Sequence, residues 1–377
     1  MPSEAERTGL IAILLPDLRG GGVERVRTLL AREFLARGYR IEFVLLRAQG
    51  ELLPDVPPGA DIIDLRAGRF RAAFWPLVKY LRRRRPAGLL AAMWPLTGLA
   101  ALAKRVARSD CRLVVSEHNA LSRTPTYQGW SGRAHRMAGA SLYRLAAGVV
   151  CVSQGVREDI RASTGLSPDR MHVVYNPVRR AVALDRAVDA DVLGWWKEGA
   201  ARLIAIGSLK PQKDFSTLLQ ALALLRQTRD ARLLILGEGT LRAELETLVS
   251  SLGLEDRVRM PGFVPDPYPY LAHADLFAIS SAWEGLGNVI IEALVAGVPV
   301  VSTDCPSGPA EILANGKYGR LVPVGDPEAL AAAMTEALDA AVDRDMLRLR
   351  GAEFSIERAA DQYLALLDPG GSTLAQR

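Results

Sequence analysis

Short apolar runs and amphipathic stretches alternate along roughly the first 150 residues of the chain. The run LIAILLP at 10–16 is continuous and apolar, which is typical of a parallel strand buried on both faces. Residues 24–37 then carry apolar side chains at helical spacing, and Gly38 marks the expected end of that helix. The same alternation predicts strands at 39–46, 88–93, 111–116 and 148–152 and helices at 71–85, 98–108 and 133–146. This order indicates a parallel, doubly wound sheet.

The pattern restarts near residue 200. It predicts strands at 201–209, 231–239, 258–264, 274–280 and 298–304 and helices at 215–227, 241–254 and 288–297. A chain of 377 residues is too long for one ordinary core, so we expect two domains. We place one Rossmann-like domain at 1–184 and a second at 185–352, with a linker near 176–194. Residues 353–377, which include an apolar stretch at 354–367, form a C-terminal helix that we expect to cross back to the first domain.

The predicted fold class is therefore α/β, with two doubly wound domains facing a central cleft where the carboxyl ends of both sheets would bind ligands. The composition is that of a soluble globular protein, 49% apolar and 24% charged. The three cysteines are scattered and form no zinc motif, so we expect buried thiols in a cytoplasmic protein. The start, MPSEAERTGL, does not look like a signal peptide. The uncharged run at 87–103 is short for a bilayer span and contains Pro95 and Gly98, which favours a buried strand followed by a helix.

Charge is distributed unevenly between the two halves. Residues 1–180 hold 29 Lys and Arg against 15 Asp and Glu, a net +14, whereas the remainder holds 18 against 27, a net −9. A basic first half suggests an anionic partner such as a membrane surface, a phosphorylated lipid or nucleic acid. The alternative is an Arg-rich solvated surface without a partner. No aromatic-interleaved patch supports nucleic acid, so we expect none.

Three loops between a strand and a helix carry candidate chemistry. GGGVERV at 20–26 would let the backbone approach an anion at a helix N-terminus, although it lacks the dinucleotide-binding spacing and a plain flexible turn is the alternative. His118 ends a predicted strand and is a candidate for acid/base work or hydrogen bonding, or a structural histidine. In GSLKPQKDF at 207–215, Lys210 and Lys213 could neutralise a phosphate or could be solvated loop lysines.

The stretch SSAWEGLGNVIIEALVAGVPV at 280–300 places Glu284 and Glu292 on either side of a glycine turn that enters an apolar helix. The amides of Gly285, Leu286, Gly287 and Asn288 would form another anion site. The readings open at this point are a metal site, an acid/base pair, a sugar clamp and surface charge. Because no Asp or His accompanies the glutamates, a metal site is weakly supported. Carboxylates accept hydrogen bonds from vicinal hydroxyls, so one glutamate could bind a ribose and the other a hexose, which favours a nucleotide-sugar as the ligand.

These residues resemble a known family. EGLGNVIIEALVAGVPVVSTDCPSGPAEIL at 284–313 resembles the E-x7-E region of retaining glycosyltransferases of family 4. GGVERV, His118, VSQGVRED, YNPV, GSLKPQKDF and GFVPD follow in that family's order, so the resemblance runs from about residue 10 to 366. It implies a GT-B fold, with the acceptor bound by the N-terminal domain and the nucleotide-sugar by the C-terminal domain.

The resemblance also implies roles for individual residues. Glu292 would bind the ribose, Glu284 the transferred sugar, and Lys213 the diphosphate together with the amides of Gly287, Asn288 and Val289. GFVPD, through Gly262, Phe263 and Val264, would contact the base, and His118 would lie over the donor sugar. Gly21, Gly22 and Arg25 would form a loop near the phosphate or the acceptor. Ser208 stands where many members carry arginine, so Lys213, helped by Lys210, would have to supply that positive charge.

The implied activity is retaining, metal-independent hexosyl transfer from a nucleoside diphosphate sugar, with UDP the first choice of base and GDP the second. No cofactor and no metal are expected. The +14 half, with RRRR at 82–85 and FRAAFWPLVKYL at 70–81, suggests a lipid-linked diphosphate or glycan acceptor and peripheral attachment to the inner face of the cell membrane. The alternatives are a soluble small-molecule aglycone as acceptor, a sugar-nucleotide epimerase of similar architecture, and a catalytically silent nucleotide-binding scaffold.

Overall fold

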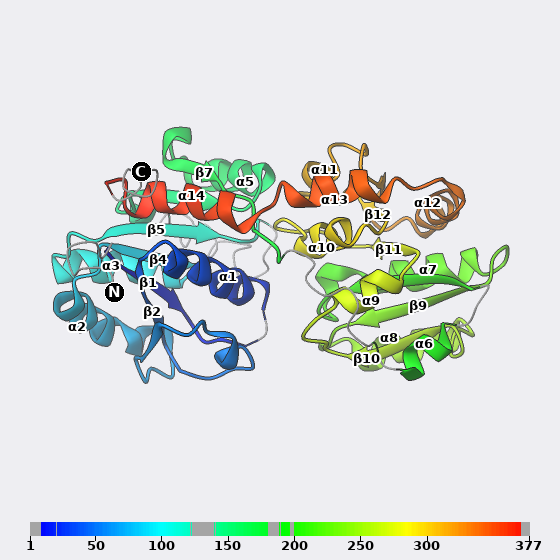
Figure 1. Cartoon of the computed structure of the whole chain (residues 1–377), viewed down its shortest axis with the longest axis horizontal. Coiled ribbons are helices and arrows are strands. Elements are labelled where there is room, and N and C mark those ends of the chain that lie inside the picture. The colour runs from blue at the N-terminus through cyan, green and yellow to red at the C-terminus, as the bar shows by residue number, and fades with distance from the viewer. Residues whose placement is uncertain are drawn as a thin grey trace. The chain divides into compact units, whose positions relative to one another are not determined.

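The computed structural model describes residues 9–19, 21–120, 122, 139, 141–179, 188, 190–196 and 200–370. The chain forms two compact units (Figure 1). The first unit comprises Met1–Val178 and Ser355–Arg377, and the second comprises Arg179–Phe354. These divisions fall six residues before and two residues after the boundaries expected from the sequence at 184 and 352. Residues 133–138 and 140 of the predicted helix at 133–146 lie outside the described residues, as do residues 180–187 and 189 of the predicted linker at 176–194.

The first unit contains a seven-stranded sheet whose described strands are all parallel. Its spatial order is β3 (Ala60–Asp64), β2 (Arg40–Leu45), β1 (Leu10–Leu15), β4 (Gly88–Ala92), β5 (Arg112–Glu117), β6 (Gly148–Cys151) and β7 (Met171–Val173). Strands β1, β2, β4, β5 and β6 were predicted. The two that were not predicted, β3 and β7, are the two edges of the sheet, where half-exposed residues give no continuous apolar run.

Helices flank this sheet and shield its central strands. They are α1 (Gly22–Ala36), α2 (Phe74–Arg84), α3 (Leu96–Ala107), α5 (Gln154–Thr164) and α14 (Ile356–Leu367), with short 3₁₀ turns at Leu53–Asp55, Phe70–Ala73 and Pro168–Arg170. The run at 87–103 becomes β4 and α3, as predicted. The C-terminal helix α14 packs against α1 and β5, so the end of the chain belongs to the first unit (Figure 1).

The second unit contains a six-stranded parallel sheet. Its spatial order is β10 (Val258–Gly262), β9 (Ala231–Leu236), β8 (Ala201–Ile206), β11 (Leu276–Ile279), β12 (Val300–Thr303) and β13 (Arg320–Val322). Only β13, again an edge strand, was not predicted. The helices are α6 (Ala190–Trp195), α7 (Phe215–Leu225), α8 (Arg242–Ser251), α9 (Tyr268–His273), α10 (Asn288–Ala296), α11 (Pro309–Ile312), α12 (Pro327–Asp339) and α13 (Arg344–Ala352), and Pro211–Lys213 form a 3₁₀ turn.

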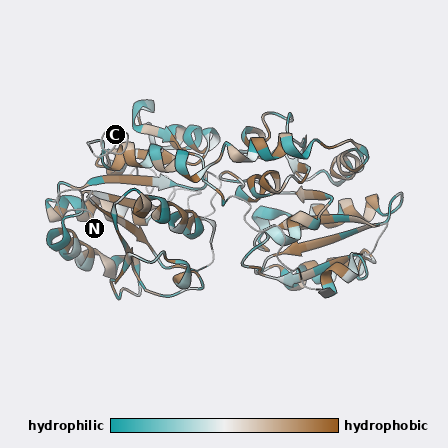
Figure 2. Cartoon of the chain, in the orientation of Figure 1, coloured by the Kyte–Doolittle hydropathy of each residue, from teal (hydrophilic) through white to brown (hydrophobic). Residues whose placement is uncertain are grey.

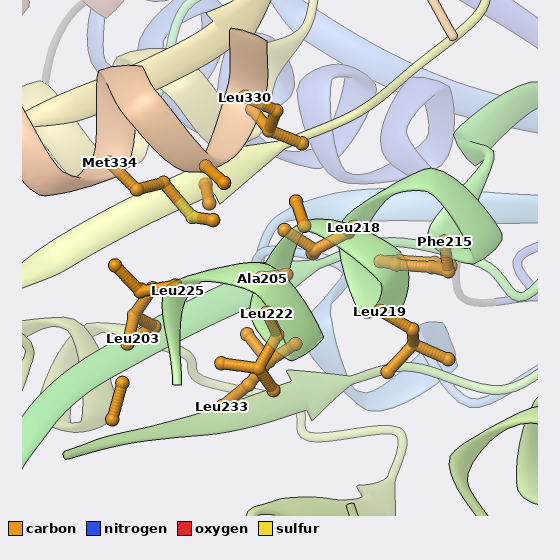
Figure 3. Close-up of a cluster of buried hydrophobic side chains, with 14 of the residues drawn as sticks. Leu203, Ala205, Phe215, Leu218, Leu219, Leu222, Leu225, Leu233, Leu330 and Met334 are labelled. Atoms are coloured by element: carbon orange, nitrogen blue, oxygen red, sulfur yellow. The ribbon is translucent and has the colours of Figure 1, made fainter. Parts of the chain in front are cut away.

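Each unit has its own apolar core. In the second unit the apolar face of α7 meets β8 and β9, while Leu330 and Met334 of α12 point toward the same cluster (Figure 3). In the first unit, β1, β2 and α1 form the core together with apolar side chains of α14. Figure 2 shows inner strands such as β1 and β9 coloured as hydrophobic, whereas many helices carry hydrophilic residues. The three cysteines are free and buried. None of the helices in the described ranges is long and apolar enough to cross a bilayer.

Candidate functional site

Two neighbouring strand ends build the site of the second unit. Strand order reverses between β8 and β11, and open α/β sheets bind ligands at such switch points. The loop after β8 and the loop after β11 lie against each other, because the Ala282 amide donates to the Gln212 carbonyl over 2.9 Å. The Ser280 hydroxyl also donates to the carbonyls of Lys213 (3.0 Å) and Asp214 (2.8 Å). Asp214 then caps α7 by accepting from the Thr217 amide. The predicted GSLKPQKDF loop and the 280–300 stretch therefore form one site.

A charged pair lies at the centre of this site. Lys213 Nζ and Glu284 Oε1 are 2.5 Å apart, and the Ser281 hydroxyl donates to the same carboxylate oxygen over 2.7 Å. Only 15% of the lysine side chain and 6% of the glutamate side chain are exposed. The aliphatic stem of Lys213 lies over Gly207, where an added Cβ would approach it to 3.1 Å. The two predicted ligand residues are thus partners of each other.

The glycine turn before α10 is held by a second loop. Gly287 has φ +92° and caps α10, so the amides of Asn288 and Val289 belong to the first turn of that helix. Gly308 packs directly against Leu286: a Cβ at position 308 would lie 2.0 Å from the Leu286 carbonyl oxygen. The sequence analysis did not identify Gly308, although it lies within the PSGP segment of the quoted motif. Gly285 and Leu286 are buried beneath this contact.

The remaining predicted donor-binding residues lie around this centre. Glu292 is half-buried in the second turn of α10. Gly262 ends β10 with φ +102°, and its carbonyl accepts from the Gly237 amide over 2.8 Å. Phe263 next to it is 44% exposed, and Val264 is half-buried. Ser208 and Lys210 are exposed in the loop after β8.

A second cluster, in the first unit, surrounds His118. This residue follows β5 and is only 7% exposed. Its Nε2 atom lies 3.1 Å from Nη2 of Arg27 and 3.1 Å from the Ser116 hydroxyl. Burial, and then the Arg27 guanidinium, hold the pKa of His118 well below its usual range. The histidine is therefore neutral at physiological pH. Arg27 was not a predicted site residue, because an arginine on an amphipathic helix gives no sign that it points inward.

In the glycine loop before α1, a glutamate side chain lies where the sequence predicted that an anion could approach. Gly20 lies outside the described residues, whereas Gly21 caps α1 and Gly22 is exposed. The carboxylate of Glu24 folds back onto this turn, since a Cβ on Gly21 would meet its Oε2 at 2.1 Å. Burial raises the pKa of Glu24, and Asp17 adds to the effect. An anion at this helix end would have to compete with that carboxylate. Arg25 is half-buried in the same turn.

Glu117, next to His118, is a buried carboxyl group that the sequence analysis did not single out. Its Oε1 accepts from the hydroxyls of Tyr143 (2.6 Å) and Thr97 (3.2 Å). The Trp94 amide donates to Oε2 over 3.4 Å. Burial raises the pKa of Glu117 to about 7 despite these three donors. The residue thereby ties the start of α3 to the end of β5. Among the residues that the structure describes, no three His, Cys, Asp or Glu side chains gather as a metal site would need.

Known protein families match residues of both units. The family described as "Glycosyl transferases group 1" matches residues 200–340, and "Glycosyltransferase Family 4" matches residues 20–181. A Campylobacter jejuni protein named N-acetylgalactosamine-N,N'-diacetylbacillosaminyl-diphospho-undecaprenol 4-alpha-N-acetylgalactosaminyltransferase is 31% identical over 66% of this chain and 65% of its own length. The lipopolysaccharide core biosynthesis glycosyltransferase LpsE of Rhizobium meliloti is 34% identical over 60% of this chain and 66% of its own. These two matches thus span just under two thirds of each relative.

A solved structure matches nearly the whole chain. HepE of Anabaena, crystallised with UDP and glucose, superposes with a TM-score of 0.74 at 21% identity, covering 98% of this chain and 100% of its own. At that identity the likeness concerns the fold alone.

Proposed function

Because this chain belongs to glycosyltransferase family 4 and has the GT-B fold, we propose that it transfers a hexose-type sugar, with retention, from a nucleoside diphosphate sugar to an acceptor hydroxyl. UDP is the first choice of donor base and GDP the second, and the crystallised complex of HepE with UDP supports that order. The acceptor class that we propose is a lipid-linked or polysaccharide precursor. The names of both sequence relatives support it, since one acts on a diphospho-undecaprenol and the other in lipopolysaccharide core synthesis.

The observation that carries this proposal is the Lys213–Glu284 pair beside the start of α10. A donor diphosphate offers the lysine a stronger partner than one carboxylate, because it carries two negative phosphates. When Lys213 turns to the diphosphate, Glu284 is released to accept hydrogen bonds from sugar hydroxyls. One exchange of partners therefore provides both a phosphate contact and a sugar contact. After this exchange the Glu284 carboxylate accepts hydrogen bonds from the sugar, so its charge is not buried without a partner.

The same residues explain how the leaving group is stabilised. Negative charge grows on the nucleoside diphosphate as its bond to the sugar breaks. Lys213 and the amides of Gly287, Asn288 and Val289 are fixed donors that can meet this charge in place of a metal ion. In this proposal the acceptor attacks from the leaving-group face and passes its proton to the departing phosphate oxygen. Retention rests on family membership rather than on the geometry of any one residue.

Other residues of the site take supporting roles in the proposal. Glu292, half-buried one turn inside α10, would bind the ribose hydroxyls. The strand end at Gly262–Val264 would contact the base, with Ser208 near the diphosphate. His118 would meet the donor sugar or the acceptor from the first unit. We expect Glu292→Ala to weaken donor binding, and His118→Ala to reduce turnover more than donor affinity.

An anionic membrane is the partner that we propose for α2 and its flanks. Residues 65–109 hold eleven Lys and Arg and no Asp or Glu. Trp75 is 66% exposed on α2, and Phe70 in the preceding turn is exposed as well. Lys79 and Arg83 follow Trp75 by four and eight residues, so all three project from one exposed helix face. Exposed aromatic side chains flanked by cations suit an anionic headgroup layer. A peripheral position on the inner face of the cell membrane would bring the enzyme to a lipid-linked acceptor.

A thermal-shift screen of UDP-, GDP- and ADP-sugars without added metal tests the donor site. A donor at about 100 times its Kd should stabilise the protein by about 2.7 kcal/mol. We expect a UDP-sugar to give the largest rise in Tm, and no shift with any of the three would refute the proposed donor site.

A transfer assay then supplies a lipid-linked diphosphate sugar or a soluble aglycone as the acceptor. Sugar turnover that needs neither acceptor would instead favour an epimerase.

Flotation on liposomes tests the membrane surface. Vesicles of anionic lipid should carry the protein upward and vesicles of neutral lipid should not, with attraction that weakens as salt rises. Trp75→Ser and Arg83→Glu should each reduce flotation. Lys317→Glu, an equal charge reversal at an exposed position of the second unit, is the matched control. Equal binding to both vesicle types, or an equal loss in the control, would contradict the proposal.

A further inference from the structure

The His118 cluster contains a fully buried arginine, Arg27. Arg27 belongs to α1, and its exposed fraction is 0%. Its Nη2 atom reaches both the Ser116 hydroxyl and Nε2 of His118, the latter over 3.1 Å. Burying a guanidinium is costly unless hydrogen bonds and opposite charges compensate it, and two of the nitrogens of Arg27 have no hydrogen-bond partner among the described residues. Its role must therefore be sought in the groups that it touches.

The contact between Arg27 and His118 determines where the imidazole proton lies. A guanidinium has five N–H donors and no hydrogen-bond acceptor. Nε2 of His118 faces one of those donors, so Nε2 must present its lone pair and cannot carry a proton. A neutral imidazole then has its proton on Nδ1, because the partner of one ring nitrogen decides the state of the other. The Ser116 hydroxyl is compatible with this arrangement because its single proton can point to Nε2 at 3.1 Å, the shorter distance, instead of to the Ala91 carbonyl at 3.4 Å.

The other ring nitrogen, Nδ1, faces none of the polar groups that the structure describes closely enough for a hydrogen bond. Nδ1 of His118 is buried and has no hydrogen-bond partner among the described residues. A buried N–H without a partner costs about 1 to 3 kcal/mol, so it is a donor that a ligand would satisfy. The positive charge of Arg27 opposes a second proton on the ring, in the same direction as burial. Glu24, one turn earlier on α1, is the acidic group that interacts with Arg27 at longer range.

The C-terminal helix holds Arg27 in place. The ring of Tyr363 from α14 lies under the guanidinium, 5.1 Å from ring centroid to Cζ. Tyr363 is itself only 1% exposed. Because α14 packs against α1 (Figure 1), a segment at the far end of the chain supports the side chain that contacts His118. This cation–π contact helps to hold the guanidinium where Nη2 reaches Nε2.

We propose that Arg27 is a positioning residue that locks His118 as the neutral imidazole protonated on Nδ1, so that His118 meets its substrate only as a hydrogen-bond donor. The partner is an oxygen with a free lone pair, such as a sugar hydroxyl, and that identification rests on the proposed function. In this state His118 does not remove a proton from the acceptor hydroxyl. The choice between acid/base work and hydrogen bonding is thereby resolved in favour of hydrogen bonding.

Nitrogen NMR of the unliganded protein tests the lock without any activity assay. Long-range ¹H–¹⁵N correlations of ring-labelled histidine distinguish the two tautomers and the cation. The chain has four histidines, and His118→Gln identifies the signal that belongs to this one. We expect His118 to stay neutral with its proton on Nδ1 from pH 5.5 to 8. A proton on Nε2, or titration close to the ordinary histidine value, would overturn the proposal.

Substitution of Arg27 supplies the second measurement. Arg27→Met removes the donor and the charge but keeps much of the buried volume, so the Ser116 oxygen can now accept from an Nε2–H. We expect the ratio of the Nδ1–H to the Nε2–H form to fall about tenfold or more, as the loss of a charged hydrogen bond implies. Arg37→Met is the matched control, because Arg37 caps the C-terminus of α1 and binds Asp361 and the Glu357 carbonyl of α14 without touching His118. An unchanged tautomer ratio in Arg27→Met would contradict the proposed role.

Kinetics complete the test. If Arg27 acts through His118, the double variant Arg27→Met/His118→Gln should lose no more kcat/KM than His118→Gln alone. Full additivity of the two losses would contradict this coupling. Absence of transfer with every donor would refute the proposed function and leave the NMR result standing, so the two failures can be told apart.

Discussion

The charged clusters of the two units differ in how their charges are balanced. In the second unit a lysine and a glutamate neutralise each other at a sheet's switch point. In the first unit a fully buried arginine faces a neutral histidine, and two of its nitrogens have no hydrogen-bond partner among the described residues. A paired site can exchange its partners for a charged ligand. An unpaired cation instead sets the protonation of its neighbour. In the reaction that we propose, the first arrangement would meet the departing diphosphate and the second an uncharged hydroxyl.

The largest expected effect comes from breaking the pair of the second unit. Lys213→Met removes the cation that would meet the diphosphate, and we expect turnover to fall by about 10²- to 10³-fold. It also leaves the buried Glu284 carboxylate unpaired, which should destabilise this unit by about 3 kcal/mol. Chemical denaturation and transfer assays measure the two losses separately.

A double variant distinguishes a pair from two independent residues. Lys213→Met/Glu284→Gln removes both charges, so most of the lost stability should return while turnover stays low. A double variant as unstable as the sum of the single losses would show that the two side chains do not compensate each other.

The first unit should respond most clearly to pH. Burial raises the pKa of Glu117 to about 7, so the folded protein retains a proton that the unfolded chain loses near the ordinary value of 4.5. This contribution to stability is complete below pH 4.5 and is lost as pH rises through 7. Glu117→Gln keeps an oxygen for Tyr143 and Thr97 but does not titrate. We expect its stability relative to wild type to rise between pH 4.5 and 8 by up to about 3 kcal/mol. A difference in Tm that is constant across this range would refute the raised pKa.

A smaller effect should come from the loop that supports the glycine turn. Gly308→Ala would place a methyl group 2.0 Å from the Leu286 carbonyl oxygen at a φ of +95°, so the turn before α10 must move. We expect donor affinity to fall about tenfold, equal to about 1.4 kcal/mol, although no ligand side chain changes. Gly325→Ala is the control: its φ is +74°, but an added Cβ meets nothing within 4 Å. Both variants place an alanine at a positive φ, but only Gly308→Ala, whose methyl group meets the Leu286 carbonyl, should weaken donor binding.

Whether a strand was predicted from the sequence depended on its position in the sheet. Strands buried on both faces, such as β1 and β9, have continuous apolar runs and were found within a few residues. The three strands that were missed, β3, β7 and β13, all lie at sheet edges, where one side lacks a neighbour and apolar runs are not required. The local pattern also gave α10 and its glycine entry, because turn glycines and helix periodicity act over a few residues.

Which side chains meet was decided by tertiary structure. Lys213 and Glu284 are 71 residues apart and Arg27 and His118 are 91 apart, and their strands and helices become neighbours only through the order of the sheets. The sequence by itself determined two α/β units, a glycine-rich entry to a helix and the residue types on which the proposed donor site rests. The pairing of Lys213 with Glu284, the burial of Arg27 and the tautomer of His118 depend on which elements pack together across long separations in the sequence. That information is absent from any local pattern, since the same arginine could face solvent on one helix and a histidine on another.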